Sequence, residues 1–189
     1  MQAPRKCQQW GKLFWVYLYN PMQTTKQLIL VRHAKSDWDD FSVSDHDRVL
    51  NERGRRDAPV MGQRIYKQYG TPDLILSSTA FRAKQTAEAI RAACQIPDQA
   101  LQFHANLYHA GPQVITDHIL ETPDSVQRLI IVCHNPGITF FANSLCGSIT
   151  DNIPTCGVVV FEIQTQAWTQ FAMANKKLID FDYPKKGLG

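Results

Sequence analysis

The stretch Gln27-Leu28-Ile29-Leu30-Val31-Arg32-His33 is a run of mainly aliphatic residues that stops abruptly at an arginine and a histidine. A second stretch, Arg128-Leu129-Ile130-Ile131-Val132-Cys133-His134, ends in the same way and continues as Asn135-Pro136-Gly137. Strands that are apolar on both faces belong in the middle of a parallel sheet that helices cover on both sides. Ligands of such sheets bind at the carboxyl ends of the strands. We therefore expect His33 and His134 to face one crevice, although they lie far apart in the sequence.

Helical and strand patterns alternate around these two stretches. The spacing predicts helices over residues 51–69, 80–94, 112–120 and 138–145, the first capped by Asn51, and further strands over residues 74–76 and 101–103. We expect residues 157–163 and 167–174 to form a closing hairpin around the turn 164–166. Residues 36–50, rich in Asp and Ser, are expected to form an active-site loop. The pattern predicts a three-layer α/β/α sandwich with a mostly parallel central sheet and an antiparallel edge.

Length and charge narrow the class of protein. A chain of 189 residues suits one domain with a substantial core. The net charge of +3 is small and the basic residues are scattered, so we expect no nucleic-acid partner. The five cysteines form neither a Cys-x-x-Cys pair nor an even-numbered framework, which favours a reducing cytoplasm. Cys133 does not begin a Cys-x5-Arg loop, so we expect a buried small residue rather than a thiolate nucleophile.

The first residues differ in character from the rest of the chain. Residues 13–19 are apolar and follow basic residues, but this stretch is too short to span a bilayer and no small-residue cleavage site follows it. Met22 precedes the first core strand, so we expect residues 1–21 to be an upstream extension of a protein that starts at Met22, and residues 22–189 to form the single domain. We expect no membrane partner, with a membrane-surface anchor in residues 1–21 as the alternative.

An arginine beside a histidine at a strand end combines a nucleophile with a cation. Neutral imidazole can attack phosphorus, and a guanidinium group can bind two non-bridging oxygens. Arg82 offers a second guanidinium group in the first turn of a helix, whose amide groups and dipole also favour an anion. His134 would donate to the phosphoryl oxygens. Arg32, His33, Arg82 and His134 could together neutralise a phosphoryl group, or bind a phosphate ion, without a metal or another cofactor.

Several other residues in the sequence are expected to have no catalytic role. Asp37, Asp39 and Asp40 are more often solvated than metal ligands, and we expect no metal site. Trp38 and Phe41 are expected at the rim of the substrate pocket, because their loop should overhang the crevice. The remaining histidines, which are His46, His104, His109 and His118, are expected to be structural or exposed.

Four ordered motifs resemble the histidine phosphatase superfamily, whose fold is phosphoglycerate mutase-like. They are Arg32-His33-Ala34, the Ser-Ser-x-x-x-Arg-Ala-x-x-Thr-Ala pattern of residues 77–87, His134-Asn135-Pro136-Gly137, and the segment 45–54. Together with residues 32–38, the last segment most resembles the SixA type of phosphohistidine phosphatase. The resemblance extends from about Leu28 to Ile163.

The resemblance implies a role for each matching residue. His33 would be the nucleophile that is transiently phosphorylated, Arg32 and Arg82 would hold the phosphoryl oxygens, and His134 would stabilise the transferring group. Arg48 stands where relatives have a further phosphate-contacting arginine. With Ser36 and Asn135, it completes the expected substrate-binding set.

One departure from the superfamily bears on the substrate. Many relatives have a glutamate general acid after the third strand, whereas residues 106–111 contain no carboxylate. An alkoxide is a strongly basic leaving group, because its conjugate acid has a pKa near that of water, about 15.7. It therefore needs a proton from an acid in order to leave. A protonated phosphoimidazole instead departs as neutral imidazole, whose conjugate acid has a pKa of about 6.5. Asp37, Asp40, Asp45 or His109 could still supply the proton.

The sequence therefore leaves three functions open. The first is a metal-independent phosphatase for a phosphohistidine-containing protein, such as a phosphorelay domain in signal transduction. The second is a phosphomonoesterase for a small phosphorylated molecule. The third is a binding module that keeps the phosphate pocket without turnover.

Overall fold

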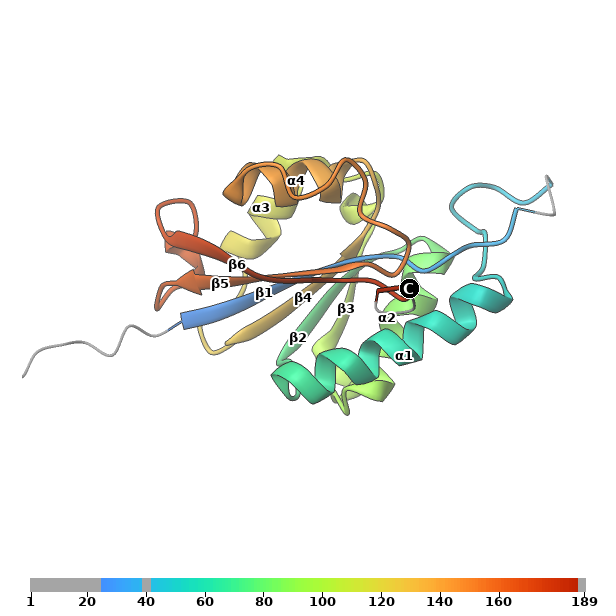
Figure 1. Ribbon diagram of the computed structural model, residues 1–189, viewed down its shortest axis with the longest axis horizontal. Helices are drawn as coiled ribbons and strands as arrows, with labels where there is room; N and C mark the ends of the chain where they lie inside the picture. The colour runs from blue at the N-terminus through green and yellow to red at the C-terminus, as the bar shows by residue number, and fades with distance from the viewer. Residues whose placement is uncertain (1–24, 39–41, 187–189) are drawn as a thin grey trace, which may run out of the picture.

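The computed structural model describes residues 25–38 and 42–186, which form a central sheet between two layers of helices (Figure 1). The strands are β1 (Thr25–Arg32), β2 (Leu74–Ser78), β3 (Leu101–His104), β4 (Arg128–Cys133), β5 (Val158–Gln164) and β6 (Asn175–Asp182). The helices are α1 (Glu52–Tyr69), α2 (Phe81–Ala93), α3 (Pro112–Leu120) and α4 (Gly137–Cys146), with short 3-10 turns at Asp98–Ala100, Ala105–Leu107 and Trp168–Gln170.

The strands lie in the order β3-β2-β4-β1-β5-β6. The first four of these pair in parallel, whereas β5 and β6 add an antiparallel edge. The three-layer sandwich with a mostly parallel sheet and an antiparallel edge, predicted from the alternating pattern, is confirmed.

Strand β1 supplies two hydrophobic cores at once. Leu28 and Leu30 face the core beneath α3 and α4, while Ile29 and Val31 face the core beneath α1 and α2. All four side chains are fully buried. Burying a side chain of this size stabilises a fold by roughly 1.5–3 kcal/mol, so the uninterrupted apolar run requires a helix layer on each face.

The register between β1 and β4 brings the two histidine motifs together. Arg32 is paired with Cys133, and the His33 amide donates to the Cys133 carbonyl oxygen at 3.1 Å. The chain therefore leaves both strands at the same level. Because His33 and His134 each follow their strand directly, their ring centroids lie 4.9 Å apart.

Helix α1 begins where the sequence places its cap. The side-chain oxygen of Asn51 accepts a hydrogen bond from the Gly54 amide at 2.9 Å, and Gly70, with φ of +75°, follows the last turn. A Cβ on Gly54 would overlap the carbonyl oxygen of Lys35. Glycine at this position lets the helix pack directly against the segment that follows His33.

A buried hydroxyl ties the end of β1 to α2. Thr86 donates to the Arg82 carbonyl oxygen at 2.6 Å and accepts from the Ala34 amide at 3.0 Å. The backbone beside His33 is thus held by the same helix that carries Arg82.

The predicted strand over residues 167–174 is wrong. This segment forms a 3-10 turn at Trp168–Gln170, and the strand that pairs with β5 starts only at Asn175. Trp168 and Phe171 are both buried, a spacing of three that suits a helical turn better than a strand. The Trp168 indole nitrogen also donates to the Val126 carbonyl oxygen at 2.8 Å, which holds the turn against the end of the sheet that lies away from the histidines.

No helix in the described part of the chain is long and apolar enough to cross a membrane. The predicted extension, residues 1–21, and the expected start at Met22 lie outside the described residues.

Gly137→Ala should destabilise the protein by about 2 kcal/mol or more, because a Cβ on Gly137 would overlap the carbonyl oxygen of Ala110 where α4 begins. Urea denaturation of the variant checks this. Gly111→Ala is the control, since a Cβ there meets no atom within 4 Å, and its loss should stay below about 1 kcal/mol. Equal losses in the two variants would contradict the steric explanation.

Thr86→Val should lower the free energy of unfolding by about 2 kcal/mol, because the isosteric change leaves the buried Ala34 amide without its partner. Thr116→Val removes a comparable hydroxyl bond, from Thr116 to the Pro112 carbonyl oxygen, at an exposed position, and should cost much less. Denaturant titration of both variants makes the comparison. If Thr116→Val lowers the free energy of unfolding as much as Thr86→Val does, the hydrogen bond to the Ala34 amide does not explain the loss.

Candidate active site

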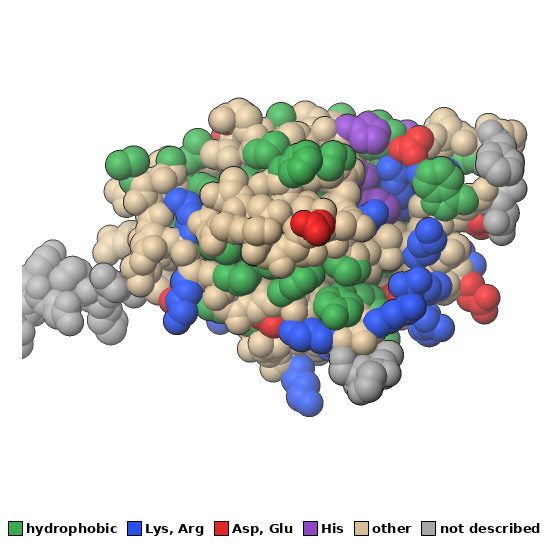
Figure 2. All heavy atoms as spheres, turned by 45° about the horizontal axis from the view of Figure 1, so that its top comes forward, with side chains coloured by type: hydrophobic (Ala, Val, Ile, Leu, Met, Phe, Trp, Pro, Cys, Tyr) green, Lys and Arg blue, Asp and Glu red, His purple; other side chains and the backbone are tan. Residues whose placement is uncertain are grey.

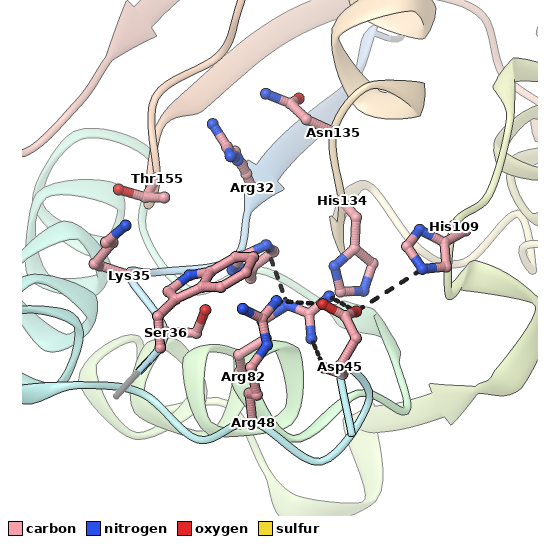
Figure 3. A pocket seen from close by; sticks show the side chains of 12 residues that line it. Arg32, Lys35, Ser36, Asp45, Arg48, Arg82, His109, His134, Asn135 and Thr155 are labelled. Atoms are coloured by element: carbon pink, nitrogen blue, oxygen red, sulfur yellow. Dashed lines mark hydrogen bonds and ion pairs between the residues drawn. The ribbon is translucent and has the colours of Figure 1, made fainter. Parts of the chain in front are cut away.

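A polar cavity of about 300 Å³ opens at the carboxyl ends of β1, β2 and β4 (Figure 3). In the space-filling view, histidine side chains lie beside acidic and basic ones at one end of the visible face (Figure 2). The cavity is lined by Arg32, His33, Lys35, Ser36, Trp38, Asp45, Arg48, Arg82, His109, His134, Asn135 and Thr155. All seven residues expected to act in catalysis or substrate binding are therefore brought together.

His33 lies on the floor of the cavity, with 8% of its surface exposed. Its Nδ1 lies 2.8 Å from the Ala34 carbonyl oxygen, so Nδ1 carries the proton and donates it. Nε2 then keeps its lone pair and accepts from Nε of Arg82 at 3.3 Å. Burial lowers the pKa of His33 to about 3, further helped by the nearby arginine charges and partly opposed by the bond to Ala34. The imidazole is therefore neutral near pH 7, and the lone pair of Nε2 meets the Arg82 guanidinium group.

Arg82 comes from the first turn of α2 and is only 3% exposed. Its Nη1 donates to the Asp45 carbonyl oxygen, and its Nη2 donates to Oδ2 of Asp45 at 2.8 Å. One guanidinium group thus links the His33 imidazole to the loop that precedes α1.

Arg48 lies beside Arg82 and is 9% exposed. Its guanidinium carbon lies 3.5 Å from the centre of the Trp38 ring, a cation-π contact in which the half-exposed indole covers the arginine. Nη2 donates to Oδ1 of Asp45. The expected place of Trp38 at the rim of the pocket is confirmed, whereas Phe41 lies outside the described residues.

His134 closes the cavity from the side of β4. Its Nε2 lies 2.8 Å from the Ser78 hydroxyl, which already accepts from the Ala80 amide. We therefore assign the hydroxyl proton to the bond with Nε2, which leaves Nδ1 as the protonated nitrogen of His134. Burial lowers the pKa of His134 to about 2, and the nearby His33 and Arg82 lower it further. His134 is therefore neutral near pH 7 and offers one N–H donor.

Arg32 and Asn135 lie together on a separate wall of the cavity, away from Arg48 and Arg82 (Figure 3). Both side chains bind the same segment, because each donates to Asn152 and to the Ile153 carbonyl oxygen. The side-chain Oδ1 of Asn135 accepts from the Thr139 hydroxyl at 2.7 Å. Asn135 thus helps to position the wall that carries Arg32, and its expected contact with substrate remains a prediction.

The cavity concentrates polar nitrogen atoms that lack a partner. Among the described residues, the buried side-chain nitrogens without one are Nε of Arg32, Nε and Nη1 of Arg48, Nδ1 of His134 and Nε2 of His104. All but the last belong to cavity-lining residues. Buried donors normally find acceptors, so this set favours a ligand that brings several negatively charged oxygens.

Asp45 has a larger place in the site than its sequence context indicates. Burial opposes ionisation of its carboxyl group, but hydrogen bonds from Tyr108 and Arg82 and the charges of Arg82 and Arg48 outweigh burial and lower the pKa to about 2. The sequence had suggested Asp45 only as a substitute acid, and an ionised carboxylate cannot donate a proton. Tyr108 was missed because a tyrosine after a short edge strand carries no specific signal.

The structure also bears on the other residues that the sequence raises as candidates, which are the loop aspartates and Cys133. Asp37 does not line this cavity, and Asp40 lies outside the described residues. Within residues 25–38 and 42–186, no cluster of three His, Cys, Asp or Glu side chains could hold a metal ion. Cys133 is fully buried, as expected, and burial raises the pKa of its thiol to about 12.

Comparisons with known proteins place these features in a family. Residues 28–107 match the model of the histidine phosphatase superfamily, branch 1. An uncharacterised protein of Mycobacterium tuberculosis is 30% identical over 165 residues, which cover 82% of this chain and all of the relative. An uncharacterised chloroplastic protein of Arabidopsis thaliana is 29% identical over 160 residues, covering 79% of this chain and 72% of the relative.

Solved structures agree with the sequence relatives. A candidate phosphohistidine phosphatase SixA from Agrobacterium tumefaciens superposes with a TM-score of 0.71 and 29% identity, covering 84% of this chain and 99% of that structure. The protein histidine phosphatase SixA complexed with tungstate has the same fold, with a TM-score of 0.69, 19% identity, and coverage of 84% and 97%. The chain therefore belongs to the histidine phosphatase superfamily and is similar to its SixA-type members.

Proposed function

We propose that this protein hydrolyses the phosphoryl group of a protein phosphohistidine, without a metal, through a phosphorylated His33. The observation that carries the proposal is the neutral His33 imidazole, whose Nε2 lone pair meets the Arg82 guanidinium at the floor of a cavity rich in unpaired N–H groups. This arrangement offers a nucleophile and an oxyanion cradle in the same place.

In the first step, the Nε–H of Arg82 turns from Nε2 of His33 to a phosphoryl oxygen, and the freed lone pair of Nε2 attacks the phosphorus atom of the substrate. A bond forms between Nε2 and phosphorus, and the phosphorus–nitrogen bond of the substrate breaks. Its electron pair stays on the substrate imidazole, which leaves neutral because its other nitrogen is protonated. Arg32, Arg48, Arg82 and the Nδ1–H of His134 would hold the phosphoryl oxygens, while the Ala34 carbonyl oxygen keeps the Nδ1–H of His33 in place.

In the second step, water attacks the phosphorylated His33. The oxygen–phosphorus bond forms as the phosphorus–Nε2 bond breaks, and the electron pair returns to Nε2. The surplus proton of the water passes to a phosphate oxygen or to solvent. Such transfers need positioning and charge stabilisation more than a strong base, which suits a site built from arginines and neutral histidines.

The preference for a phosphoramidate rests on the acids of the cavity. Among the described lining residues, Asp45 is the one carboxylic acid, and its low pKa keeps it ionised near pH 7. An ionised carboxylate cannot protonate an alkoxide, whereas neutral imidazole leaves unaided. We also propose a reducing, cytoplasmic location, since the buried Cys94, Cys133 and Cys156 are free thiols. A place in signal transduction would follow from a phosphohistidine-containing substrate protein.

A second candidate is a phosphomonoesterase for a small phosphorylated molecule. Its support is His109, which lines the cavity with an exposed side chain and has Nε2 at 3.8 Å from Asp45. A protonated His109 held by that carboxylate could give a proton to an ester oxygen.

His33→Ala should abolish acid-labile labelling of the protein after rapid quench with a phosphohistidine donor, because the intermediate forms on Nε2 of His33. Wild type should be labelled and release inorganic phosphate. His118→Gln is the control, since His118 is similarly buried but lies in α3, outside the cavity, and it should label like wild type. Labelling that survives in His33→Ala would contradict the covalent mechanism.

A substrate panel separates the remaining functions. Strong turnover of sugar phosphates with none of a phosphohistidine protein would reject our proposal in favour of the phosphomonoesterase. Phosphate binding without labelling or release of phosphate would indicate a binding module.

The free energy of unfolding should fall as the pH drops from 7 to 5. His33 and His134 keep pKa values of about 3 and 2 in the folded protein, whereas unfolded histidine takes up its proton near pH 6.5. The unfolded state then binds more protons, so stability is lost at on the order of 1 kcal/mol per pH unit for each histidine. Urea titrations at both pH values measure the slope. It should shrink in His33→Gln, and an unchanged slope would show that His33 is protonated in the folded protein.

A further inference from the structure

The Asp45 carboxylate binds two of the three arginines that line the cavity, Arg48 and Arg82 (Figure 3). Its Oδ1 accepts from Nη2 of Arg48, and its Oδ2 accepts from Nη2 of Arg82 at 2.8 Å. The Tyr108 hydroxyl donates to Oδ2 at 2.7 Å, and Nε2 of His109 lies 3.8 Å from the same oxygen. The carboxylate is thus surrounded by donors that come from three separate segments of the chain.

These contacts are the ones that a phosphoryl group would need. Two carboxylate oxygens satisfy two guanidinium groups in the way that two non-bridging phosphoryl oxygens can. Each Nη2 group has a second hydrogen, but the carboxylate already occupies the position that bridges the two guanidinium groups, and two anions cannot fill that position at once. A phosphoryl group that enters the fork between the arginines must therefore take these donors from the carboxylate.

We propose that Asp45 is an internal competitor for the phosphoryl subsite, whose carboxylate holds Arg48 and Arg82 until a doubly charged phosphoryl group displaces it. The inference rests on the proposed function for the location of that subsite, and it adds a residue that sets which anions can enter and how fast phosphate leaves.

The exposed fractions of the three side chains indicate that Asp45 moves and that the arginines stay in place. The Asp45 side chain is 43% exposed, whereas Arg48 and Arg82 are 9% and 3% exposed. The carboxylate can turn into water and recover its hydration, but the arginines cannot leave without losing the packing around them. The Asp45 backbone can stay in place, because its carbonyl oxygen accepts from Nη1 of Arg82. A side-chain rotation is thus sufficient for the exchange.

The charge of an incoming anion decides whether it can displace the Asp45 carboxylate. A singly charged anion, such as a carboxylate or a phosphodiester, would replace one negative charge with another and gain little. A terminal phosphoryl group with two negative charges gains additional attraction to the arginines in a site partly shielded from water. The low pKa of Asp45 keeps the competitor charged at any pH at which the protein is normally assayed.

The competitor also acts after hydrolysis. Inorganic phosphate bound between Arg48 and Arg82 would be a strong product inhibitor if nothing opposed it. Return of the Asp45 carboxylate offers the arginines a replacement partner as phosphate leaves. The apparent affinity for phosphate is then reduced by the fraction of molecules in which the fork is open.

Calorimetric titration of the folded full-length protein with inorganic phosphate tests the proposal. Asp45→Asn keeps the shape of the side chain but removes its charge, and it should bind phosphate about five- to tenfold more tightly than wild type. Phosphate should also inhibit turnover more strongly in this variant, while a thermal melt verifies that it folds.

Asp47→Asn is the matched control. It changes the net charge by the same amount two residues along the same loop, but Asp47 binds Ser44 and His46 rather than the arginines. This variant should bind phosphate within about twofold of wild type, because its charge is solvated and more distant. Asp45→Ala provides a second neutral variant, and it should gain affinity as Asp45→Asn does.

The possible results separate the inference from its alternatives. Unchanged or weaker phosphate binding in both Asp45 variants would overturn it, and weaker binding would mean that the carboxylate holds the arginines in position for substrate. An equal gain in Asp47→Asn would reduce the effect to net charge and would also overturn it. Absence of phosphate binding in wild type and in every variant would show that Arg48 and Arg82 form no phosphate subsite, and it would overturn the inference. Tighter binding in the Asp45 variants without phosphohistidine hydrolysis by wild type would keep the inference and reject the proposed function.

Discussion

The pairing of β1 with β4 is the constraint on which the site depends. The two strands are parallel, share both hydrophobic cores and end at the same level. His33 and His134 follow them directly, so two imidazoles from distant parts of the chain meet in one cavity. A register shift of one residue would exchange the two faces of a strand and turn its apolar side chains toward the wrong cores. The hydrophobic packing of these two strands thus fixes the positions of His33 and His134.

Neutral histidines beside buried arginines form a site with an unusual balance of charge. Burial keeps His33 and His134 unprotonated, so they do not compete with Arg48 and Arg82 for an incoming anion. The arginines remain charged and bring the attraction, while the imidazoles bring a lone pair and an N–H donor. Because His33 is already neutral near pH 7, the proposed attack would need no prior removal of a proton from His33.

Much of this arrangement was predictable from the sequence, because it follows from local patterns. The apolar runs that end in His33 and His134 predict the central strands, and the cap at Asn51 predicts the start of α1. The prediction that residues 167–174 form a strand was wrong because the burial of Trp168 against Val126 is a long-range contact that no local pattern encodes.

The place of Asp45 was equally hidden from the sequence. Its role depends on where an irregular loop returns to the cavity, and on partners from α2 and from the segment after β3. Loop conformations of this kind are set by many weak contacts rather than by a residue period. The sequence therefore identified most of the polar residues that line the cavity, but not the contacts of the Asp45 carboxylate with Arg48 and Arg82.

The burial of Cys133 has a consequence for the environments in which this site can work. Enzymes that use a thiolate to attack phosphorus are inactivated when peroxide oxidises that sulfur to sulfenic or sulfinic acid. Here the sulfur next to His134 is fully enclosed, and its raised pKa leaves almost no thiolate at neutral pH. In the proposed mechanism the nucleophile is a nitrogen of His33, which peroxide does not readily oxidise. That mechanism would tolerate peroxide at concentrations that inactivate a cysteine-based phosphatase.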